Sequence, residues 1–261
     1  MRVSAGRPTV SELRAVAQPP EVLGRSAHEH WSGLLYMRRL SIHLTRLVLP
    51  TRITPDMLTC TMGLLGVAAA VVLTVPAIWA AVVMFLLLQL QLLLDCSDGE
   101  LARWRGPSGG ARGVYIDNLS HWVTDAFLLA AVAVRADGGL RSIDGWTTVG
   151  LATAVLALLV HAETDLVYVA RAKLGLTAPD AAAVVPQVGF VRRLRRLLAH
   201  LPVNRLLSAW DLSYVVLVVA VVDAVRGGLT ATRGLTVVLV AVAIYAVLGH
   251  LLSVLTSRRL R

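Results

Sequence analysis

Six apolar runs dominate the pattern of hydrophobic and polar positions along the chain. Each run approaches the roughly 20 residues that a helix needs to cross the hydrocarbon core of a membrane. Backbone groups in that core must be hydrogen-bonded within their own segment, which favours helices. We therefore expect an all-α integral membrane fold with six transmembrane helices. The expected spans lie near residues 57–75, 77–95, 114–134, 146–169, 210–225 and 235–255, and the fifth is short and contains Asp223.

The chain before the first apolar run is polar and basic. From His28 to Leu49 apolar residues alternate with arginines, so a broad apolar face has basic margins. This pattern is typical of an amphipathic helix that lies in the membrane interface. A helix of the same pattern buried in the protein core is the alternative. We divide the chain into an N-terminal tail with an interfacial helix, residues 1–49, and a six-helix membrane catalytic domain, residues 50–261.

The composition supports a membrane protein. Hydrophobic residues make up 56% of the 261 residues, and the mean hydropathy is +0.70, which excludes an ordinary soluble domain. The net charge of +9 fits basic loops that face anionic lipid, and we expect no nucleic-acid partner. Cys60 and Cys96 lie in or beside apolar runs, so we expect neither a disulfide nor a cysteine-based metal site.

The basic residues predict an orientation. If the apolar runs all cross the membrane, 21 of the 25 Lys and Arg residues fall on one side. These residues lie in the N-terminal segment, the 96–113 turn, the 170–209 connection and the C-terminal end. Loops on the cytoplasmic side are enriched in Lys and Arg. We therefore expect a cell-membrane protein with both termini and the 96–113 turn in the cytoplasm.

Ionisable residues gather where the second and third apolar runs meet. Asp95 and Asp98 are three residues apart, so they share a face of a helix. Asp117, His121 and Asp125 recur at every fourth residue and share a face as well. Ionisable groups at this depth are costly and indicate a functional site. Several carboxylates that converge at one end of a helix pair suit a hard divalent cation.

The spacing of this segment resembles the signature of the CDP-alcohol phosphotransferase family. That signature reads D-x-x-D-G-x-x-A-R, then a spacer of eight or nine residues, then G-x-x-x-D-x-x-x-D. Seven of its eight fixed positions are matched here, and His121 stands where the last Asp is expected. The matching residues are Asp95, Asp98, Gly99, Ala102, Arg103, Gly113 and Asp117.

The resemblance implies an enzyme that moves a substituted phosphate group from a CDP-alcohol to an acceptor hydroxyl and releases CMP. CDP-diacylglycerol is the expected donor, phospholipid synthesis the expected process and a homodimer the expected assembly. Asp95, Asp98 and Asp117 are then metal ligands. Mg²⁺ or Mn²⁺ is the expected cofactor, with two ions, because carboxylate oxygens and substrate phosphates both bind such ions.

The resemblance also assigns substrate-binding residues. The small residues Gly99, Ala102 and Gly113 would shape the cytidine pocket. Arg103 follows Gly99 by one helical turn and would hold a phosphate.

Two further parts of the chain are candidates for substrate binding. Thr54 and Pro55 predict the start of a helix, and the family often has T-P-N-x-x-T here, near the nucleotide. Asp56 stands where that Asn is usual. Arg192 and Arg193 belong to a basic cluster that could recognise a phosphorylated acceptor or anchor the chain to anionic lipid.

Four roles are open for His121. As a neutral imidazole it could accept the proton of the acceptor hydroxyl, and we expect this role because the family places its base there. As a transition-metal ligand it would shift the preference towards Mn²⁺ or Zn²⁺. Alternatively it is inert and Asp125, one turn further on, serves as the base. In the fourth case the protein binds substrate without turnover.

A different class of function also fits the pattern. Glu163 and Asp165 stand beside His161 within the fourth apolar run. They could line the same polar cavity or pair with arginines of the bundle. Carboxylates and histidines inside a membrane also occur in proton-coupled carriers. A transporter, or a non-catalytic membrane protein that binds lipid or nucleotide, is therefore the alternative.

Overall fold

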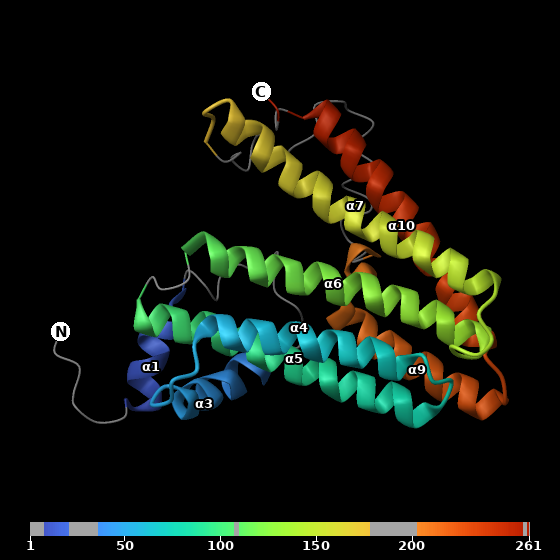
Figure 1. Cartoon of the computed structure of the whole chain (residues 1–261), viewed down its shortest axis with the longest axis horizontal. Helices are drawn as coiled ribbons and strands as arrows, with labels where there is room; N and C mark the ends of the chain where they lie inside the picture. The colour runs from blue at the N-terminus through green and yellow to red at the C-terminus, as the bar shows by residue number, and fades with distance from the viewer. Residues whose placement is uncertain (1–7, 21–35, 107–109, 178–202, 258–259, 261) are drawn as a thin grey trace. The chain divides into compact units, whose positions relative to one another are not determined.

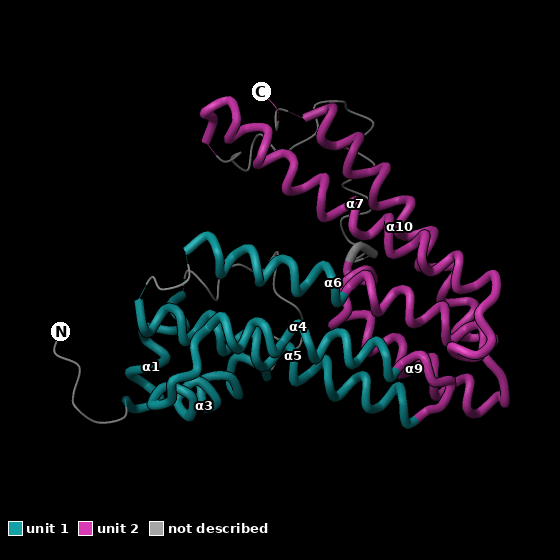
Figure 2. Tube along the Cα trace, viewed as in Figure 1, with its two compact units in different colours: residues 1–72, 79–124 teal, residues 73–78, 125–261 magenta. Residues whose placement is uncertain are grey.

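The computed structural model describes residues 8–20, 36–106, 110–177, 203–257 and 260. The chain divides into two compact units, each of which is described by itself (Figure 2). Regular structure in the described ranges is helical throughout (Figure 1), which confirms the all-α prediction. Unit 1 contains Met1–Val72 and Trp79–Thr124, and unit 2 contains Leu73–Ile78 and Asp125–Arg261.

Five of the described helices are long and apolar enough to cross a membrane, which supports an integral membrane protein. The fifth predicted span, residues 210–225, forms helix α9 (Ala209–Arg226). Its 18 residues include two aspartates and one arginine, and it is not among the five apolar helices. The count of six spans is therefore not confirmed. The five are α4 (Pro55–Leu73), α5 (Ile78–Arg105), α6 (Gly110–Asp137), α7 (Gly145–Lys173) and α10 (Thr230–Thr256).

Within the described part of the chain before α4, two short helices pack against each other in unit 1. Helix α1 (Val10–Ala17) begins after Thr9, whose hydroxyl accepts from the backbone N–H of Glu12. The backbone N–H and hydroxyl of Thr9 donate to Glu12 in return, and these bonds hold the pKa of this exposed carboxyl below its ordinary value. Leu13 and Ala17 of α1 are fully buried with Ile42 of helix α3 (Arg38–Val48).

Helix α3 covers the later part of the amphipathic helix expected from His28 to Leu49, and residues 28–35 lie outside the described residues. Two leucines of α3, Leu40 and Leu47, are exposed. The helix therefore buries one face in the protein and exposes apolar residues elsewhere, and its place in the membrane interface stays a prediction. The buried positions are Ser41, Ile42, Thr45 and Val48.

Helices α4, α5 and α6 meet in unit 1 at a buried polar contact. Gln91 is fully buried, and its Nε2 donates to Thr124 Oγ1 at 2.8 Å. Gly66 of α4 lies against this pair. A Cβ added to Gly66 would lie 2.0 Å from Thr124 Oγ1 and 2.7 Å from Gln91 Nε2. Small residues allow such close approach of helices in membranes. Gly66 therefore helps to set the spacing of the three helices that carry the candidate site.

Replacing Gly66 with Ala is expected to destabilise the protein by about 1 to 3 kcal/mol, because the added methyl group overpacks the contact and displaces the Thr124 hydroxyl. Thermal unfolding in detergent measures the effect. Gly249 of α10 has open space around it, so Gly249→Ala is the matched control and should not destabilise. Equal unfolding temperatures for the two variants would contradict this account of Gly66.

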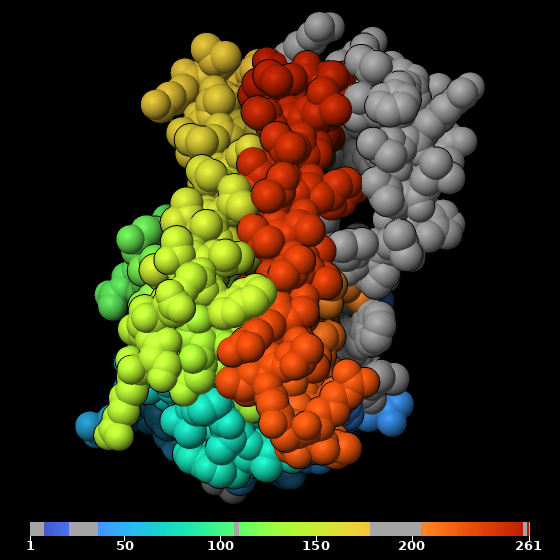
Figure 3. Space-filling view, turned by 90° about the vertical axis from the view of Figure 1, so that its right-hand side faces the viewer, coloured from blue at the N-terminus to red at the C-terminus, as the bar shows by residue number. Residues whose placement is uncertain are grey.

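Unit 2 is built on helices α7 and α10, which pack along each other (Figure 3). Helix α9 and a 3₁₀ helix, η2 (Val203–Leu207), pack against α10 and against each other. Asp137 and Asp223 cap helix starts in this unit. Asp137 Oδ2 accepts from the backbone N–H and hydroxyl of Thr147 near the start of α7, and Asp223 Oδ2 accepts from the same groups of Thr232 in α10. Each satisfies backbone N–H groups that have no partner within their own helix.

Candidate functional site

Two carboxylates and an imidazole meet where α5 and α6 run together in unit 1. His121 Nε2 lies 3.2 Å from Asp117 Oδ1, one turn away on α6, and 3.3 Å from Asp95 Oδ1 on α5. One ligand atom from each of the three residues lies within 4.8 Å of the others. All three side chains are partly exposed. This group of three is called the Asp–Asp–His cluster.

The donor set of the Asp–Asp–His cluster fits a divalent cation. Two carboxylate oxygens suit hard ions such as Mg²⁺, and an imidazole nitrogen suits Mn²⁺ or Zn²⁺ better than Mg²⁺. Two of the three expected ligands, Asp95 and Asp117, belong to the cluster, and His121 is its third member. The transition-metal role considered for His121 therefore has direct geometric support, although neither the ion nor the number of ions follows from the cluster.

Asp98 lies close to the cluster but makes a different contact. Its Oδ2 accepts a hydrogen bond from Thr59 Oγ1 of α4 at 2.5 Å. Thr59 is buried, so the hydroxyl holds the carboxylate in a fixed orientation. Sequence reasoning did not assign a role to Thr59, although it occupies the last position of the T-P-N-x-x-T pattern and could have been found from it.

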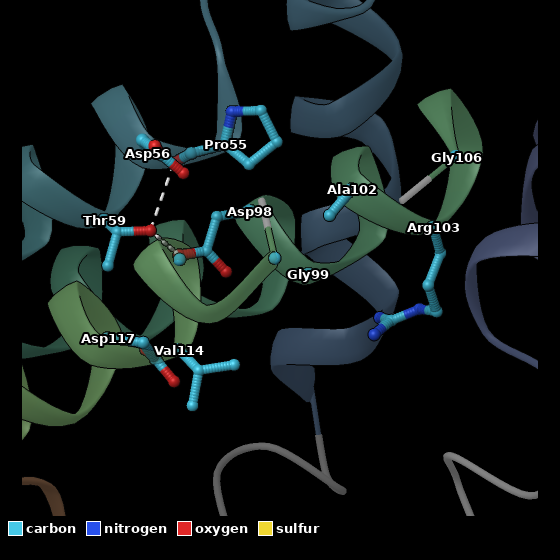
Figure 4. Close-up of a pocket in the computed structure, with 12 residues that line it drawn as sticks. Pro55, Asp56, Thr59, Asp98, Gly99, Ala102, Arg103, Gly106, Val114 and Asp117 are labelled. Carbon is cyan, nitrogen blue, oxygen red and sulfur yellow. Dashed lines mark hydrogen bonds between the residues drawn. The ribbon is translucent and has the colours of Figure 1, made fainter. Parts of the chain in front are cut away.

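Five of the expected substrate-binding residues, Asp56, Gly99, Ala102, Arg103 and Gly113, line one pocket of about 490 Å³ in unit 1 (Figure 4). This volume is in the range of small-molecule sites. Asp56, Asp98 and Asp117 contribute carboxylates to its lining. The lining residues are Pro55, Asp56 and Thr59 from α4, Asp98, Gly99, Ala102 and Arg103 from α5, Gly106 after it, and Gly110, Gly113, Val114 and Asp117 from α6.

Arg103 lines this pocket and keeps a buried donor without a partner among the described residues. Its Nε donates to the carbonyl of Ala17 at 2.6 Å, which fixes the side chain against α1. Its Nη2 is buried and has no hydrogen-bond partner among the described residues. Gly99 lies against the same guanidinium, since an added Cβ would be 3.1 Å from Nη1. A phosphate oxygen would satisfy the remaining donor of Arg103.

The start of α4 forms another wall. Thr54 Oγ1 accepts from the backbone N–H of Met57 at 3.2 Å, so the expected helix cap is confirmed, but Thr54 does not line the pocket. Asp56 does line it and forms an ion pair of 3.5 Å with Arg112, whose side chain is largely exposed. A Cβ on Gly113 would lie 3.6 Å from Asp56 Oδ1, so the glycine keeps space open beside this carboxylate.

Glu100 is a buried carboxylate of α5 that accepts hydrogen bonds from residues that precede α4. Glu100 is fully buried, and its Oε1 accepts from Gln18 Nε2 at 2.7 Å and from the hydroxyl of Ser41. Its Oε2 accepts from Thr45 Oγ1 at 2.7 Å. Glu100 therefore ties the signature segment of α5 to the two helices before α4. It occupies a variable position of the signature, so spacing gave no indication of this role.

Arg105 makes a second tie between α5 and the preceding chain. Its guanidinium donates to the carbonyls of Leu49, Thr51 and Ile53, which join α3 to α4. Glu100 and Arg105 thus bond the end of α5 to several parts of the preceding chain. Asp98, Gly99 and Ala102 consequently belong to a helix segment with little freedom to move.

Asp125, the alternative base, is engaged within unit 2. Its Oδ1 accepts from the backbone N–H of Ala209 at 2.7 Å, and its Oδ2 lies 3.2 Å from His161 Nε2. The side chain is 12% exposed. These contacts give Asp125 a capping role at the start of α9.

Glu163 has a histidine partner among the described residues of unit 2. Glu163 Oε2 lies 3.6 Å from His250 Nδ1 of α10, so the carboxylate and imidazole form a pair between α7 and α10. The pairing with arginines considered from sequence stays a prediction. Arg192 and Arg193 lie outside the described residues.

No protein-family model matches this chain, and no curated protein matches it.

Proposed function

We propose that the protein is a CDP-alcohol phosphotransferase of phospholipid synthesis. It would move a substituted phosphate group from a CDP-alcohol, with CDP-diacylglycerol as the donor, to an acceptor hydroxyl and release CMP. One observation carries the proposal. Six of the seven residues that match the family signature line a single pocket, and that pocket includes two of the three expected metal-binding carboxylates, Asp98 and Asp117.

Different residues would bind different parts of the CDP-alcohol. Gly99, Ala102 and Gly113 leave room for the nucleotide to approach the helix backbones. Arg103 would hold a phosphate oxygen through the guanidinium nitrogen that lacks a partner. Asp95, Asp98 and Asp117 would hold Mg²⁺ or Mn²⁺, as one or two ions. Such ions neutralise the charge of the pyrophosphate.

His121 would act as the general base. The acceptor hydroxyl gives its proton to the imidazole while its oxygen forms a bond to the phosphorus of the substituted phosphate. The bond between this phosphorus and the oxygen of the CMP phosphate breaks, and CMP leaves with the electron pair. Asp95 and Asp117 lie close enough to His121 to offset the positive charge that forms on the ring.

The proposed reaction is tested by CMP release from CDP-diacylglycerol with a panel of alcohols, using the purified protein. CMP should form with at least one alcohol, and chelation by EDTA should abolish the reaction because the pyrophosphate charge is then uncompensated. Added Mg²⁺ or Mn²⁺ should restore it. Full turnover in EDTA would rule out this chemistry.

We also propose that the site faces the cytoplasm of the cell membrane, where CDP-alcohols are available, and that the protein is a homodimer. The orientation rests on the distribution of Lys and Arg. A reporter fused after Arg261 should be cytoplasmic and one inserted near Gly138 should be external. Reporters on the same side would contradict an odd number of spans between Gly138 and Arg261. Cross-linking in the membrane measures the oligomeric state, and a monomer only would refute the dimer.

A transporter or a non-catalytic binding protein is the second candidate. Its support is the pair of carboxylate–imidazole contacts in unit 2, Asp125 with His161 and Glu163 with His250. Such pairs inside a membrane also serve proton transfer in carriers. Binding of CDP-diacylglycerol without CMP release from any alcohol would favour this candidate.

A further inference from the structure

A buried arginine near the end of α6 has an unsatisfied donor. Arg135 of unit 2 is 2% exposed. Its Nη1 donates to the carbonyls of Val75 at 2.7 Å and Ala77 at 3.0 Å. Its Nε is buried and has no hydrogen-bond partner among the described residues. Since nearly all buried polar groups are satisfied by protein, water or a ligand, this N–H calls for a partner.

Arg135 lines a pocket of about 340 Å³ within unit 2. This volume can hold a small polar ligand. The pocket shares no lining residue with the candidate site of unit 1. Its other walls are Pro76 and Ile78, Ala220, Asp223 and Ala224 of α9, and the turn from Gly227 to Leu229.

The carboxylate in this pocket does not neutralise Arg135 directly. Asp223 is buried, and its oxygens accept from the backbone N–H of Ala231 and from the backbone N–H and hydroxyl of Thr232. Within the described residues no ion pair joins Asp223 to Arg135. A second guanidinium lies beside this end of α6, because Arg233 Nε donates to the carbonyl of Ala136 at 3.1 Å.

We propose that this pocket binds a phosphate-bearing anion through Arg135. The phosphate is either the phosphodiester headgroup of a membrane phospholipid or free inorganic phosphate. A buried guanidinium without a direct counter-ion is costly, and an anion in the pocket removes that cost. The planar donors of arginine match phosphate oxygens, and the carbonyls of Val75 and Ala77 hold the side chain in place beforehand.

The experiment measures binding of three probes to delipidated protein in detergent with EDTA present. The probes are phosphatidylglycerol, diacylglycerol without a phosphate, and inorganic phosphate against chloride at equal ionic strength. Thermal stabilisation as a function of probe concentration gives the affinity. Phosphatidylglycerol or inorganic phosphate should stabilise the wild type, and diacylglycerol should not. Stabilisation by the lipid alone identifies a lipid headgroup, and stabilisation by inorganic phosphate shows that the free anion suffices.

Two variants and one control locate the binding. Gly228→Glu places a carboxylate at the pocket while Arg135 keeps its carbonyl contacts, and Arg135→Gln removes the guanidinium. Both should weaken binding about tenfold or more, the usual scale for a hydrogen bond to a charged group. Gly145→Glu adds the same charge at an exposed position that does not line the pocket, and it should bind as the wild type does.

Binding of phosphate or lipid at the Arg135 pocket is independent of the proposed transferase activity. Asp98→Asn removes a carboxylate of the candidate site in unit 1 and should leave this binding unchanged. Phosphate or lipid binding that is equal in wild type and Gly228→Glu overturns the proposal, and so does the absence of binding to all probes. In either case Arg135 holds only the two carbonyls and water.

Discussion

Asp98→Asn should lower CMP release by about 10³-fold or more. Asp98 lines the pocket together with Asp117, and its charge would help to hold a divalent cation against the substrate phosphates. Asparagine keeps the shape of the side chain and can still accept from Thr59, so the loss is one of charge. Metal ions contribute several kcal/mol to charge stabilisation in such reactions, and each 1.4 kcal/mol is about tenfold in rate.

The measurements for Asp98→Asn are initial rates and nucleotide binding with and without Mg²⁺ or Mn²⁺. Binding should weaken mainly in the presence of the ion. The matched control is Asp165→Asn on α7, a carboxylate that does not line this pocket, and its activity should stay within a few-fold of the wild type. Wild-type turnover in Asp98→Asn would remove the metal-dependent transferase from consideration.

His121→Ala should lose about 10²-fold or more in kcat, the usual effect of removing a general base. His121→Asp, which restores the residue expected from the family signature, should keep appreciable activity. The metal-ligand role of His121 can be measured separately, and it has geometric support because His121 Nε2 lies beside Asp95 and Asp117. As a base, His121 affects kcat at saturating metal. As a metal ligand, it affects chiefly the metal concentration that activity requires.

The comparison of kcat with metal dependence therefore decides between these roles of His121. If activity of His121→Ala returns at high Mn²⁺, the base assignment fails and the ligand role is correct. Unchanged turnover in His121→Ala at every metal concentration would exclude both roles. Asp125 would be the next candidate, but its carboxylate must first leave Ala209 and His161.

Helix periodicity and hydropathy predicted the arrangement of the site because α5 and α6 are long, apolar and joined by a short turn. Asp95 and Asp98 come together with Asp117 for this reason. The small residues Gly99, Ala102 and Gly113 line the pocket as well, and these were assigned by the resemblance to the family signature. These features depend on helical geometry and on spacing along the chain. They need no knowledge of tertiary contacts.

Contacts between distant segments could not be predicted in this way. Glu100 bonds to Gln18 across more than eighty residues of sequence, and Asp125 reaches Ala209 across a similar distance. A carboxylate in a helix has the same local pattern whether it binds metal, caps another helix or bonds to hydroxyls. The fifth apolar run shows the same difficulty, because α9 contains charges whose cost depends on partners such as Thr232 for Asp223.

The buried bonds of Glu100 predict how related sequences should vary. A carboxylate whose hydrogen-bond partners among the described residues are the side chains of Gln18, Ser41 and Thr45 cannot be replaced alone, because each change leaves a buried group without its partner. These four positions should therefore co-vary. A relative with an apolar residue in place of Glu100 should also lack the three donors, even though Gln18 lies far outside the signature. Related proteins would then conserve the N-terminal helices and the signature helix together.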